Sequence, residues 1–336
     1  MFGFLIFIHE FGHFITARIF KVKINEFSIG MGPKLAWYDS KKSGIRYSLA
    51  MLPIGGFVAM AGEDDESDDP NSFDKKPAWQ RLIITFAGAF VNIVAGFLAM
   101  AILVAMINVG DTTVAEFVDK SETGYDISSS ESGLMEGDVI VEVDGRKVDI
   151  LDELSYEIMR RGHEPIDITV IRNGERMVIP DVVFPGLSEQ GQSFGTMDFR
   201  VKRVEKTFGT VISYSWQKSV LIIRMCWESV FDLITGRYTF AAVSGPVGIS
   251  SAISDAAKAG FASLLNIVAI ISINLGVMNL LPIPALDGGR ILTILIEIIT
   301  KKKLPKKVEG MINGIGLMLL LALSFVIMIK DVIQLF

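Results

Sequence analysis

The sequence predicts a polytopic α-helical membrane protein with folded segments outside the bilayer. Half of its 336 residues are hydrophobic, and its mean hydropathy of +0.45 is high for a soluble protein. The apolar residues gather in four long runs, and the charged residues, 21% of the chain, concentrate between these runs. This distribution is expected if the runs lie in lipid and the remaining segments meet water.

The four apolar runs are candidate transmembrane helices. The first extends from Met1 to about Phe20, and at about 1.5 Å per residue it measures about 30 Å, just enough to span a bilayer. It has no basic n-region and no small-residue cleavage site, so we expect a retained helix and not a removed signal peptide. The other three runs cover about residues 82–109, 264–281 and 311–329.

Basic residues in the short loops predict the topology. Residues 18–81 carry ten Lys and Arg, and residues 290–307 carry six. With four spans these two loops lie on the same side, which the positive-inside rule makes cytoplasmic, and residues 111–260 then lie outside. Residues 208–234 are apolar but carry four charges, so we expect an amphipathic helix at the membrane surface there.

Residues 111–185 have the composition of a soluble α/β or β domain. Val- and Ile-rich runs at 138–144 and 166–171 are bounded by Asp-Gly and Asn-Gly turns, which predicts strands, and residues 154–161 predict a short helix. Between the first two apolar runs, short Gly-rich apolar pieces indicate strands and tight turns. The acidic run at 63–69 predicts a solvated loop.

Charge and cysteine content exclude several classes of function. A net charge of −6 leaves no broad basic face for phosphate groups, which argues against nucleic-acid binding. The single cysteine, Cys226, excludes an intramolecular disulfide and a cysteine-based metal or redox site. The chain has only three histidines, and two of them stand four residues apart.

Those two histidines belong to an H-E-x-x-H motif formed by His9, Glu10 and His13. Positions i and i+4 share one face of a helix, so both imidazoles can bind one zinc ion while Glu10 accepts a proton from the metal's water. The motif also occurs by chance, and a histidine cluster in a soluble core is the alternative. Ionisable residues near the middle of a membrane span are costly, however, and favour the functional interpretation.

A catalytic zinc ion requires a third protein ligand, for which Asp287 is the best candidate. It is the only carboxylate between Gly260 and Glu297, and it follows a Pro-broken segment at the end of an apolar run. The alternative is an ordinary Asp-Gly turn at the membrane surface. Asn279 can offer its amide to a substrate backbone or an oxyanion. A hydrogen bond between two helices explains Asn279 nearly as well. For Asn92 such a hydrogen bond is the better explanation.

The chain resembles the site-2 protease family of intramembrane metalloproteases in these residues and in several further motifs. It resembles in particular the bacterial members with a PDZ domain between the second and third spans. The resemblance covers almost the whole chain and depends on the order of several motifs, each weak alone. They are His9-Glu-Phe-Gly-His13, Phe27-Ser-Ile-Gly-Met-Gly32, Leu52-Pro-Ile-Gly-Gly56, Gln80-Arg81, Ala87-Gly-Ala-Phe-Val-Asn92, Ser244-Gly-Pro-Val-Gly-Ile249, Asn279-Leu-Leu-Pro282 and Leu286-Asp-Gly-Gly289.

The resemblance implies a division of the chain into four segments. A first catalytic membrane half covers residues 1–109 and contains a membrane re-entrant β-hairpin loop at about 24–60. A PDZ-like domain covers residues 110–186, and a linker with an amphipathic surface helix covers 187–260. The second catalytic membrane half covers residues 261–336.

The resemblance also implies the site. His9, His13 and Asp287 would hold one Zn²⁺ per chain, and Glu10 would be the catalytic base. Asn279 would lie near the substrate. Ile54, Gly55 and Gly56 belong to the β-loop, which would bind an unwound substrate as an added strand.

From the resemblance we expect a multi-pass protein of the bacterial cytoplasmic membrane with an extracytoplasmic PDZ-like domain. Its partners would be the bilayer and pre-trimmed single-pass membrane proteins, such as anti-sigma factors or signal-peptide remnants. The PDZ-like domain would either bind peptide C-termini or only exclude bulky substrates. Two features depart from the family pattern: only eight residues precede His9, so that the natural start lies upstream or the first span is short, and Ala89 stands where the family often has proline.

Two rival functions give different expectations. A non-enzymatic adapter on an inactive protease fold would lack activity, but the complete set of His9, Glu10, His13 and Asp287 speaks against it. A metal transporter would need polar residues along a path through the spans, and the second and fourth runs are nearly devoid of them.

Overall fold

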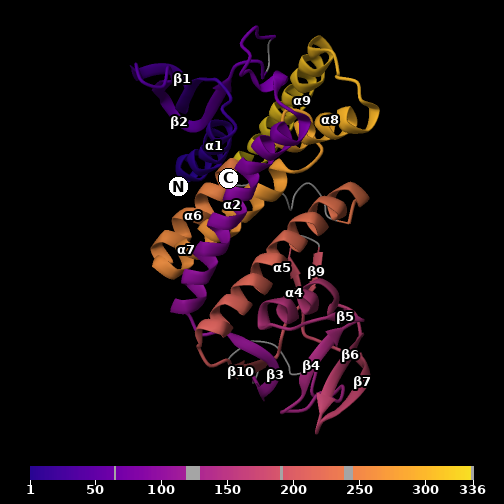
Figure 1. Cartoon of the computed structure of the whole chain (residues 1–336). Coiled ribbons are helices and arrows are strands. Elements are labelled where there is room, and N and C mark those ends of the chain that lie inside the picture. Colours follow the sequence, from indigo (N-terminus) through magenta and orange to yellow (C-terminus); the bar gives the residue numbers. More distant parts are fainter. Residues whose placement is uncertain (64–65, 119–128, 190–191, 238–244, 334–336) are drawn as a thin grey trace. The chain divides into compact units, whose positions relative to one another are not determined.

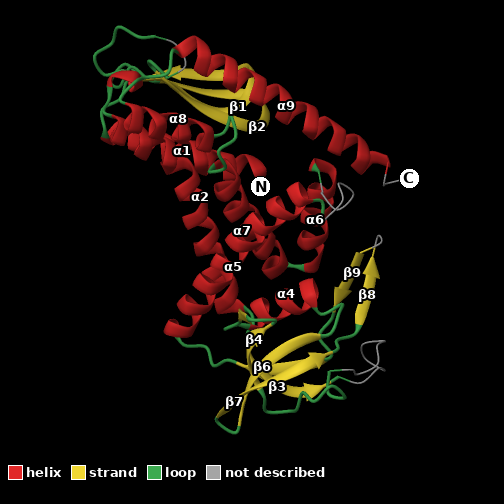
Figure 2. Ribbon diagram, turned by 90° about the vertical axis from the view of Figure 1, so that its right-hand side faces the viewer, coloured by secondary structure: helices red, strands yellow, loops and turns green. Residues whose placement is uncertain are grey.

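The computed structural model describes residues 1–63, 66–118, 129–189, 192–237 and 245–333 (Figure 1). The chain forms two compact units, one made of residues 1–99 and 222–336 and the other of residues 100–221. Helices make up most of the first unit, whereas the second contains a β-sheet (Figure 2). Residues 64–65 of the acidic run and Ser244 of the motif before the third apolar run lie outside the described residues.

Helices dominate the first unit. They are α1 (Phe2–Ile19), α2 (Ala78–Met106), α6 (Pro246–Ala259), α7 (Phe261–Asn279), α8 (Asp287–Thr300) and α9 (Lys306–Ile333), with a short 3₁₀ turn, η1 (Phe73–Lys75). Helix α2 and a further helix, α5 (Phe208–Thr235), each contain residues of both units.

Three of the described helices are long and apolar enough to cross a membrane: α2, α7 and α9. They coincide with the predicted second, third and fourth spans to within about five residues at each end. Helix α1, 18 residues long, carries the H-E-x-x-H motif but is not among these three. A first span at α1 therefore stays a prediction. Helix α5 is not among them either, and its place at the membrane surface stays a prediction.

Glycines bring α1, α2 and α7 into close contact. A Cβ atom added to Gly12 of α1 would lie 2.6 Å from the carbonyl oxygen of Ala87 on α2. A Cβ added to Gly276 of α7 would lie 2.7 Å from the carbonyl oxygen of Ala89. Such distances leave no room for a methyl group, so these backbones touch directly, as small residues allow between membrane helices.

A curled sheet follows α1. It consists of β1 (Ile24–Asp39) and β2 (Arg46–Met60), whose register is antiparallel with several irregularities. Residues 26–29 of β1 each pair with two residues of β2: Phe27, for example, pairs with Val58 and with Tyr47. Residues 56–60 of β2 therefore have a partner on one side only in the described pairing and form an open edge.

The segment between α7 and α8 breaks the helix as its prolines and glycines predict. Helix α7 ends at Asn279 and α8 begins at Asp287. A Cβ on Gly288 would lie 2.0 Å from the carbonyl oxygen of Leu281, and one on Gly289 would lie 2.4 Å from that of Ile283. The glycines after Asp287 thus let the first turn of α8 pack directly on the preceding loop.

The second unit contains a six-stranded sheet and one helix on its core. The strand order is β10 (Phe199–Arg203), β3 (Gly110–Phe117), β4 (Val139–Val143), β6 (Ile166–Arg172) and β7 (Glu175–Val182), with β5 (Arg146–Lys147) on β4. Helix α4 (Leu151–Arg161) buries Leu154 and Ile158 against these strands, and β8 (Gly186–Glu189) pairs with β9 (Gln192–Gly195). The predicted strands and short helix are all present; the identity of this unit as a PDZ-like domain stays a prediction.

Two polar contacts stabilise the second unit. Arg172 donates to both carboxylate oxygens of the buried Asp138 at 2.7 Å, and this bond raises the pKa of the arginine. Tyr214 donates to Asp152 at 2.7 Å, and burial together with that carboxylate raises the pKa of the tyrosine, so it stays a protonated donor.

Candidate metal centre

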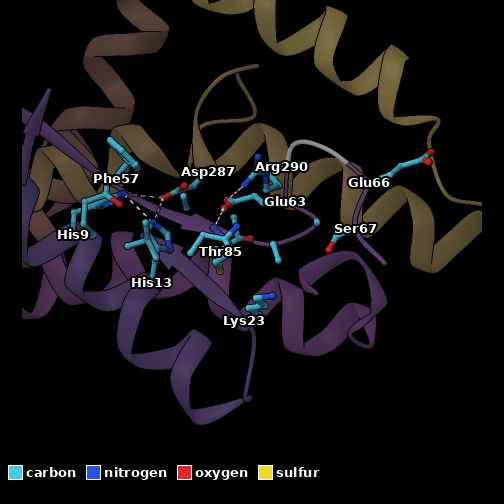
Figure 3. Close-up of a pocket in the computed structure, with 17 residues that line it drawn as sticks. His9, His13, Lys23, Phe57, Glu63, Glu66, Ser67, Thr85, Asp287 and Arg290 are labelled. Atoms are coloured by element: carbon cyan, nitrogen blue, oxygen red, sulfur yellow. Dashed lines mark hydrogen bonds and ion pairs between the residues drawn. The ribbon is translucent and has the colours of Figure 1, made fainter. Parts of the chain in front are cut away.

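Helix α1 places two imidazoles side by side. His9 and His13 stand four residues apart, which puts them on one face of the helix, and each is only 8% exposed. Their Nε2 atoms lie 3.2 Å apart (Figure 3). Two ring nitrogens that face each other at this distance in a buried place suit a shared cation between them.

Asp287, the first residue of α8, completes the group. Its Oδ2 atom lies 3.1 Å from His9 Nε2 and 3.4 Å from His13 Nε2. Zinc bonds of about 2.0–2.1 Å to tetrahedral ligands place neighbouring donor atoms about 3.3 Å apart. The three donor atoms therefore form nearly the triangle that one face of a tetrahedral zinc site requires.

Hydrogen bonds at the far sides of the rings favour the same arrangement. His13 Nδ1 donates to the carbonyl oxygen of Ile84 on α2 at 2.8 Å, which leaves the lone pair of Nε2 for a metal. His9 Nδ1 lies 3.5 Å from the side-chain amide of Asn92. Turning that amide by 180° lets Asn92 Oδ1, which has no partner among the described residues, accept from His9 Nδ1–H.

The Asp287 carboxylate gives an independent test of fit. Its buried Oδ2 makes no hydrogen bond of good geometry within the described ranges, although both imidazoles are near. A buried acceptor without a donor is costly, and a bound cation removes that cost. Two imidazoles and a carboxylate are a donor set that suits zinc.

A cavity of about 790 Å³ lies over this group, and Glu10 is part of its wall. Residues 57–63, at the open edge of β2 and the turn that follows, form another part (Figure 3). A Cβ added to Gly56 would lie 3.3 Å from Glu10 Cγ and 2.9 Å from the carbonyl oxygen of Ser28. The sheet edge thus passes close to Glu10, and glycine at position 56 permits this approach.

The remaining predicted site residues are not part of this cluster, and the side chain of Ile54 lies outside the described part of the chain. Ile54 and Gly55 belong to β2, and Gly55 has a φ of 88°, which favours glycine. Asn279 is the last residue of α7 and is half-buried, but it is not among the residues that line the cavity. Roles in substrate binding for these residues stay predictions.

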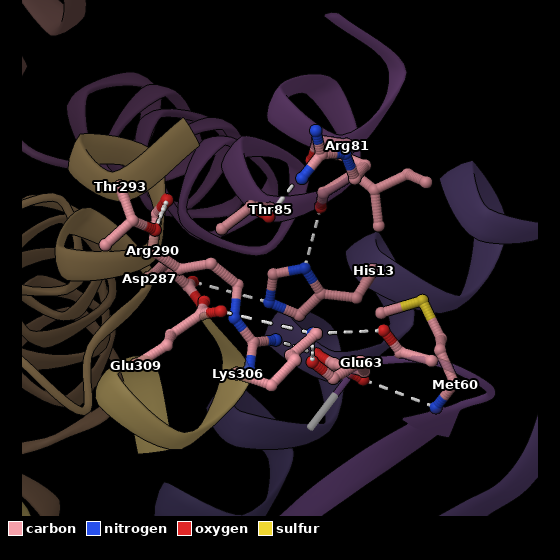
Figure 4. A network of polar contacts seen from close by, with 12 residues as sticks. His13, Met60, Glu63, Arg81, Thr85, Asp287, Arg290, Thr293, Lys306 and Glu309 are labelled. Atoms are coloured by element: carbon pink, nitrogen blue, oxygen red, sulfur yellow. Dashed lines mark hydrogen bonds and ion pairs between the residues drawn. The ribbon is translucent and has the colours of Figure 1, made fainter. Parts of the chain in front are cut away.

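A polar network at one side of the cavity joins the turn after β2 to α8 and α9 within the first unit (Figure 4). Arg290, one turn after Asp287, donates to the carboxylate of Glu63. Lys306, at the start of α9, donates to the carbonyl oxygens of Glu63 at 2.6 Å and Gly62 at 3.2 Å. The interpretation of the acidic run as a solvated loop is therefore wrong for Glu63, whose side chain is only 15% exposed.

A second ion pair connects α2 with α8. Arg81, near the start of α2, donates to Glu297 of α8 at 2.6 Å, and its side chain is 9% exposed. The sequence patterns predict no role in the site for Glu63, Arg290 or this pair, and for Asn92 they favour a helix–helix hydrogen bond. Arg81 and Asn92 stand in two of the motifs that carry the family resemblance, and Arg290 lies within one turn of Asp287; these are the usable indications.

Comparison with known proteins places the chain in a family. The family model described as peptidase family M50 matches residues 1–323. A protein of Clostridium acetobutylicum, provisionally named a zinc metalloprotease, is 36% identical over 335 residues that cover 99% of this chain and 95% of the relative. One from Fusobacterium nucleatum with the same provisional name is 34% identical, covering 100% and 97%. The regulator of sigma-W protease RasP of Bacillus subtilis is 26% identical, again covering 100% and 97%. The chain therefore belongs to peptidase family M50, the site-2 protease family of zinc metalloproteases.

Proposed function

We propose that this protein hydrolyses peptide bonds within or near the transmembrane segments of pre-trimmed single-pass membrane proteins. The observation that carries the proposal is the buried triangle of His9, His13 and Asp287 donor atoms, with sides of 3.1 to 3.4 Å, beside Glu10 and an open sheet edge. The three side chains would hold one zinc ion per chain. A bound zinc ion would lower the pKa of a water molecule and polarise the peptide carbonyl.

The protein's own groups then have separate tasks. Glu10 would accept the proton of the attacking water and pass it to the leaving amine. The Ile84 carbonyl and the Asn92 amide would keep the two imidazoles in the tautomer that leaves Nε2 unprotonated. These outer contacts come from α2, so the packing of α1 on α2 determines the shape of the site.

The open edge of β2 would present the substrate. A helical membrane segment satisfies its own amides and must be unwound before a peptide bond can reach Glu10. Unwound backbone needs new hydrogen-bond partners, and residues 56–60 offer the unpaired side of a strand next to Glu10. Ile54, Gly55 and Gly56 would contact the substrate here, and Asn279 would lie near it.

We infer the location of the protein and its biological role from the resemblance to the family. We place the chain in a bacterial cytoplasmic membrane, with α1 as a fourth span and residues 110–186 as an extracytoplasmic PDZ-like domain that binds peptide C-termini or excludes bulky substrates. Cleavage of an anti-sigma factor or of signal-peptide remnants is the role we infer. The name of its relative RasP, a regulator of sigma-W, agrees with the first of these substrates.

The proposal is tested by measuring zinc content and cleavage on the detergent-purified full chain. Wild type should contain about one zinc per chain, and His13→Ala and Asp287→Ala should each lose it. Glu10→Gln should keep the zinc but lose cleavage of a single-pass reporter substrate. Zinc retained in Asp287→Ala would mean that the third ligand lies elsewhere.

Other outcomes would favour the rival functions. Cleavage that persists in Glu10→Gln would disprove the assigned base. A wild type that binds zinc but cleaves no membrane substrate would favour an adapter. Zinc accumulation in liposomes that hold the protein would favour a transporter.

A further inference from the structure

The last backbone amide on the open edge of β2 already donates a hydrogen bond within the protein. Along an antiparallel strand, successive N–H groups point alternately toward the paired strand and away from it. The N–H of Ala61 donates to the carbonyl oxygen of Lys23, on the side of β1, at 2.9 Å. The N–H of the preceding residue, Met60, therefore faces the open side, and it donates to Glu63 Oε2 at 3.3 Å.

Glu63 is held in that position by two cations from the second membrane half. Arg290 of α8 donates to Oε1 of the same carboxylate, and Lys306 of α9 donates to the Glu63 carbonyl oxygen at 2.6 Å (Figure 4). The side chains of Glu63 and Arg290 are 15% and 20% exposed. A carboxylate bound on both oxygens and partly shielded from water does not leave an amide readily.

We propose that Glu63, held by Arg290, marks the end of the substrate-binding edge and so sets the register in which a substrate strand pairs. This inference rests on the proposed function, since it requires that the substrate bind as an added strand. A strand that pairs with residues 56–60 would have to stop at Met60, because its last outward donor is taken. Fixing the end of the strand fixes which peptide bond lies at Glu10.

The periodicity of strands makes the consequence measurable. Hydrogen-bonding groups on one side of a strand recur every two residues, about 6.8 Å along the chain. If the cap is removed, a substrate strand can extend or slide by that step. The new cleavage bonds should then lie two residues from the principal one.

The experiment maps the products of the full chain in detergent by mass spectrometry, with a reporter substrate that has one transmembrane segment. In Glu63→Ala the ratio of products displaced by two residues to the principal product should rise about fivefold, the effect of one hydrogen bond. Arg290→Gln, which removes the anchor of the carboxylate, should change the ratio in the same direction. Glu63→Gln has one acceptor oxygen in place of two, so it cannot accept from Met60 N–H and from Arg290 on separate oxygens; its ratio should rise, but less than in Glu63→Ala.

Glu66→Ala is the matched control. It removes the same charge three residues further along, from an exposed residue of the same cavity wall, and the product ratio should not change. Glu63→Ala and Arg290→Gln proteins that cleave only at the wild-type bond would overturn the proposal. So would proteins that keep zinc but lose all cleavage, since the pair would then serve activity or folding and not register.

A second measurement is independent of cleavage, so that a failure of the proposed function can be told apart. Hydrogen exchange at the Met60 amide should be about fivefold faster in Glu63→Ala than in wild type. Unchanged exchange would show that Glu63 does not cap the edge. If the wild type cleaves no better than Glu10→Gln, the proposed function fails, whereas the exchange result still decides whether the cap exists.

Discussion

Gly88 of α2 provides a direct test of the proposed metal centre, because its backbone lies against the ring of His13. A Cβ atom added at this position would stand 2.3 Å from His13 Nε2, whereas ordinary van der Waals contact begins at 3.4 Å. In Gly88→Ala the imidazole must therefore move by about 1.1 Å or α2 must move away. Distances between metals and their ligands tolerate only about 0.2 Å.

A hydrogen bond restricts the movement of the His13 ring away from α2. Its Nδ1 atom is bonded to the Ile84 carbonyl at 2.8 Å, one turn before Gly88 on the same helix, so a ring pushed away from α2 loses that bond. We expect zinc affinity to fall at least as much as on loss of an outer-shell partner, about 10–100-fold, which is about 1.4–2.8 kcal/mol. Cleavage should fall with zinc occupancy.

The assay is competition with a chelator for zinc, together with cleavage at saturating zinc. Alanine favours helix over glycine, so weaker binding in Gly88→Ala would not reflect a poorer helix. Gly314→Ala is the control, since a Cβ at Gly314 of α9 would meet nothing within 4 Å; it should bind zinc as the wild type does. Wild-type affinity and activity in Gly88→Ala would refute the assignment of His13 Nε2 as a ligand atom.

Two further predictions test the surroundings of the site and the second unit. Asn92→Leu should weaken zinc binding about tenfold by leaving His9 Nδ1–H without an acceptor, and Asn92→Asp should restore it; equal affinities in all three proteins would remove Asn92 from the site. Arg172→Leu leaves the buried Asp138 carboxylate without its cation, so hydrogen exchange of full-length protein should show β4 and β6 destabilised by about 3–5 kcal/mol. Arg176→Leu, which breaks an exposed pair, should change exchange by at most about 1 kcal/mol, and a larger loss there than in Arg172→Leu would contradict this ranking.

The sequence predicted elements whose causes are local. Three of the four long apolar runs form helices that are long and apolar enough to span a membrane, and the prolines and glycines after Asn279 end α7 there. The Asn-Gly turn gave a hairpin, in which Asn173 and Gly174 both have positive φ angles. The proximity of Asp287 to the two histidines could also be anticipated, because few carboxylates occur near that helix break.

Contacts between segments far apart in sequence could not be anticipated. Glu63 lies in a run of acidic residues, which by itself indicates a solvated loop, and its partner Arg290 is 227 residues away. For Asn92 the sequence predicted only a hydrogen bond between helices. The residues around Asn92 do not indicate that its partner on the neighbouring helix is His9. Helix α1 carries His9, Glu10 and His13 and is only 18 residues long, so a first span there stays a prediction.

The glycine contacts between α1, α2 and α7 also bear on how the protein can be studied. Where a single methyl group does not fit between two backbones, neither a lipid tail nor a detergent chain can enter. The shape of the metal site is then fixed by contacts within the protein and is insulated from the amphiphile that surrounds the spans. Zinc affinities measured in micelles should therefore equal those measured in bilayers, even if cleavage rates differ between the two.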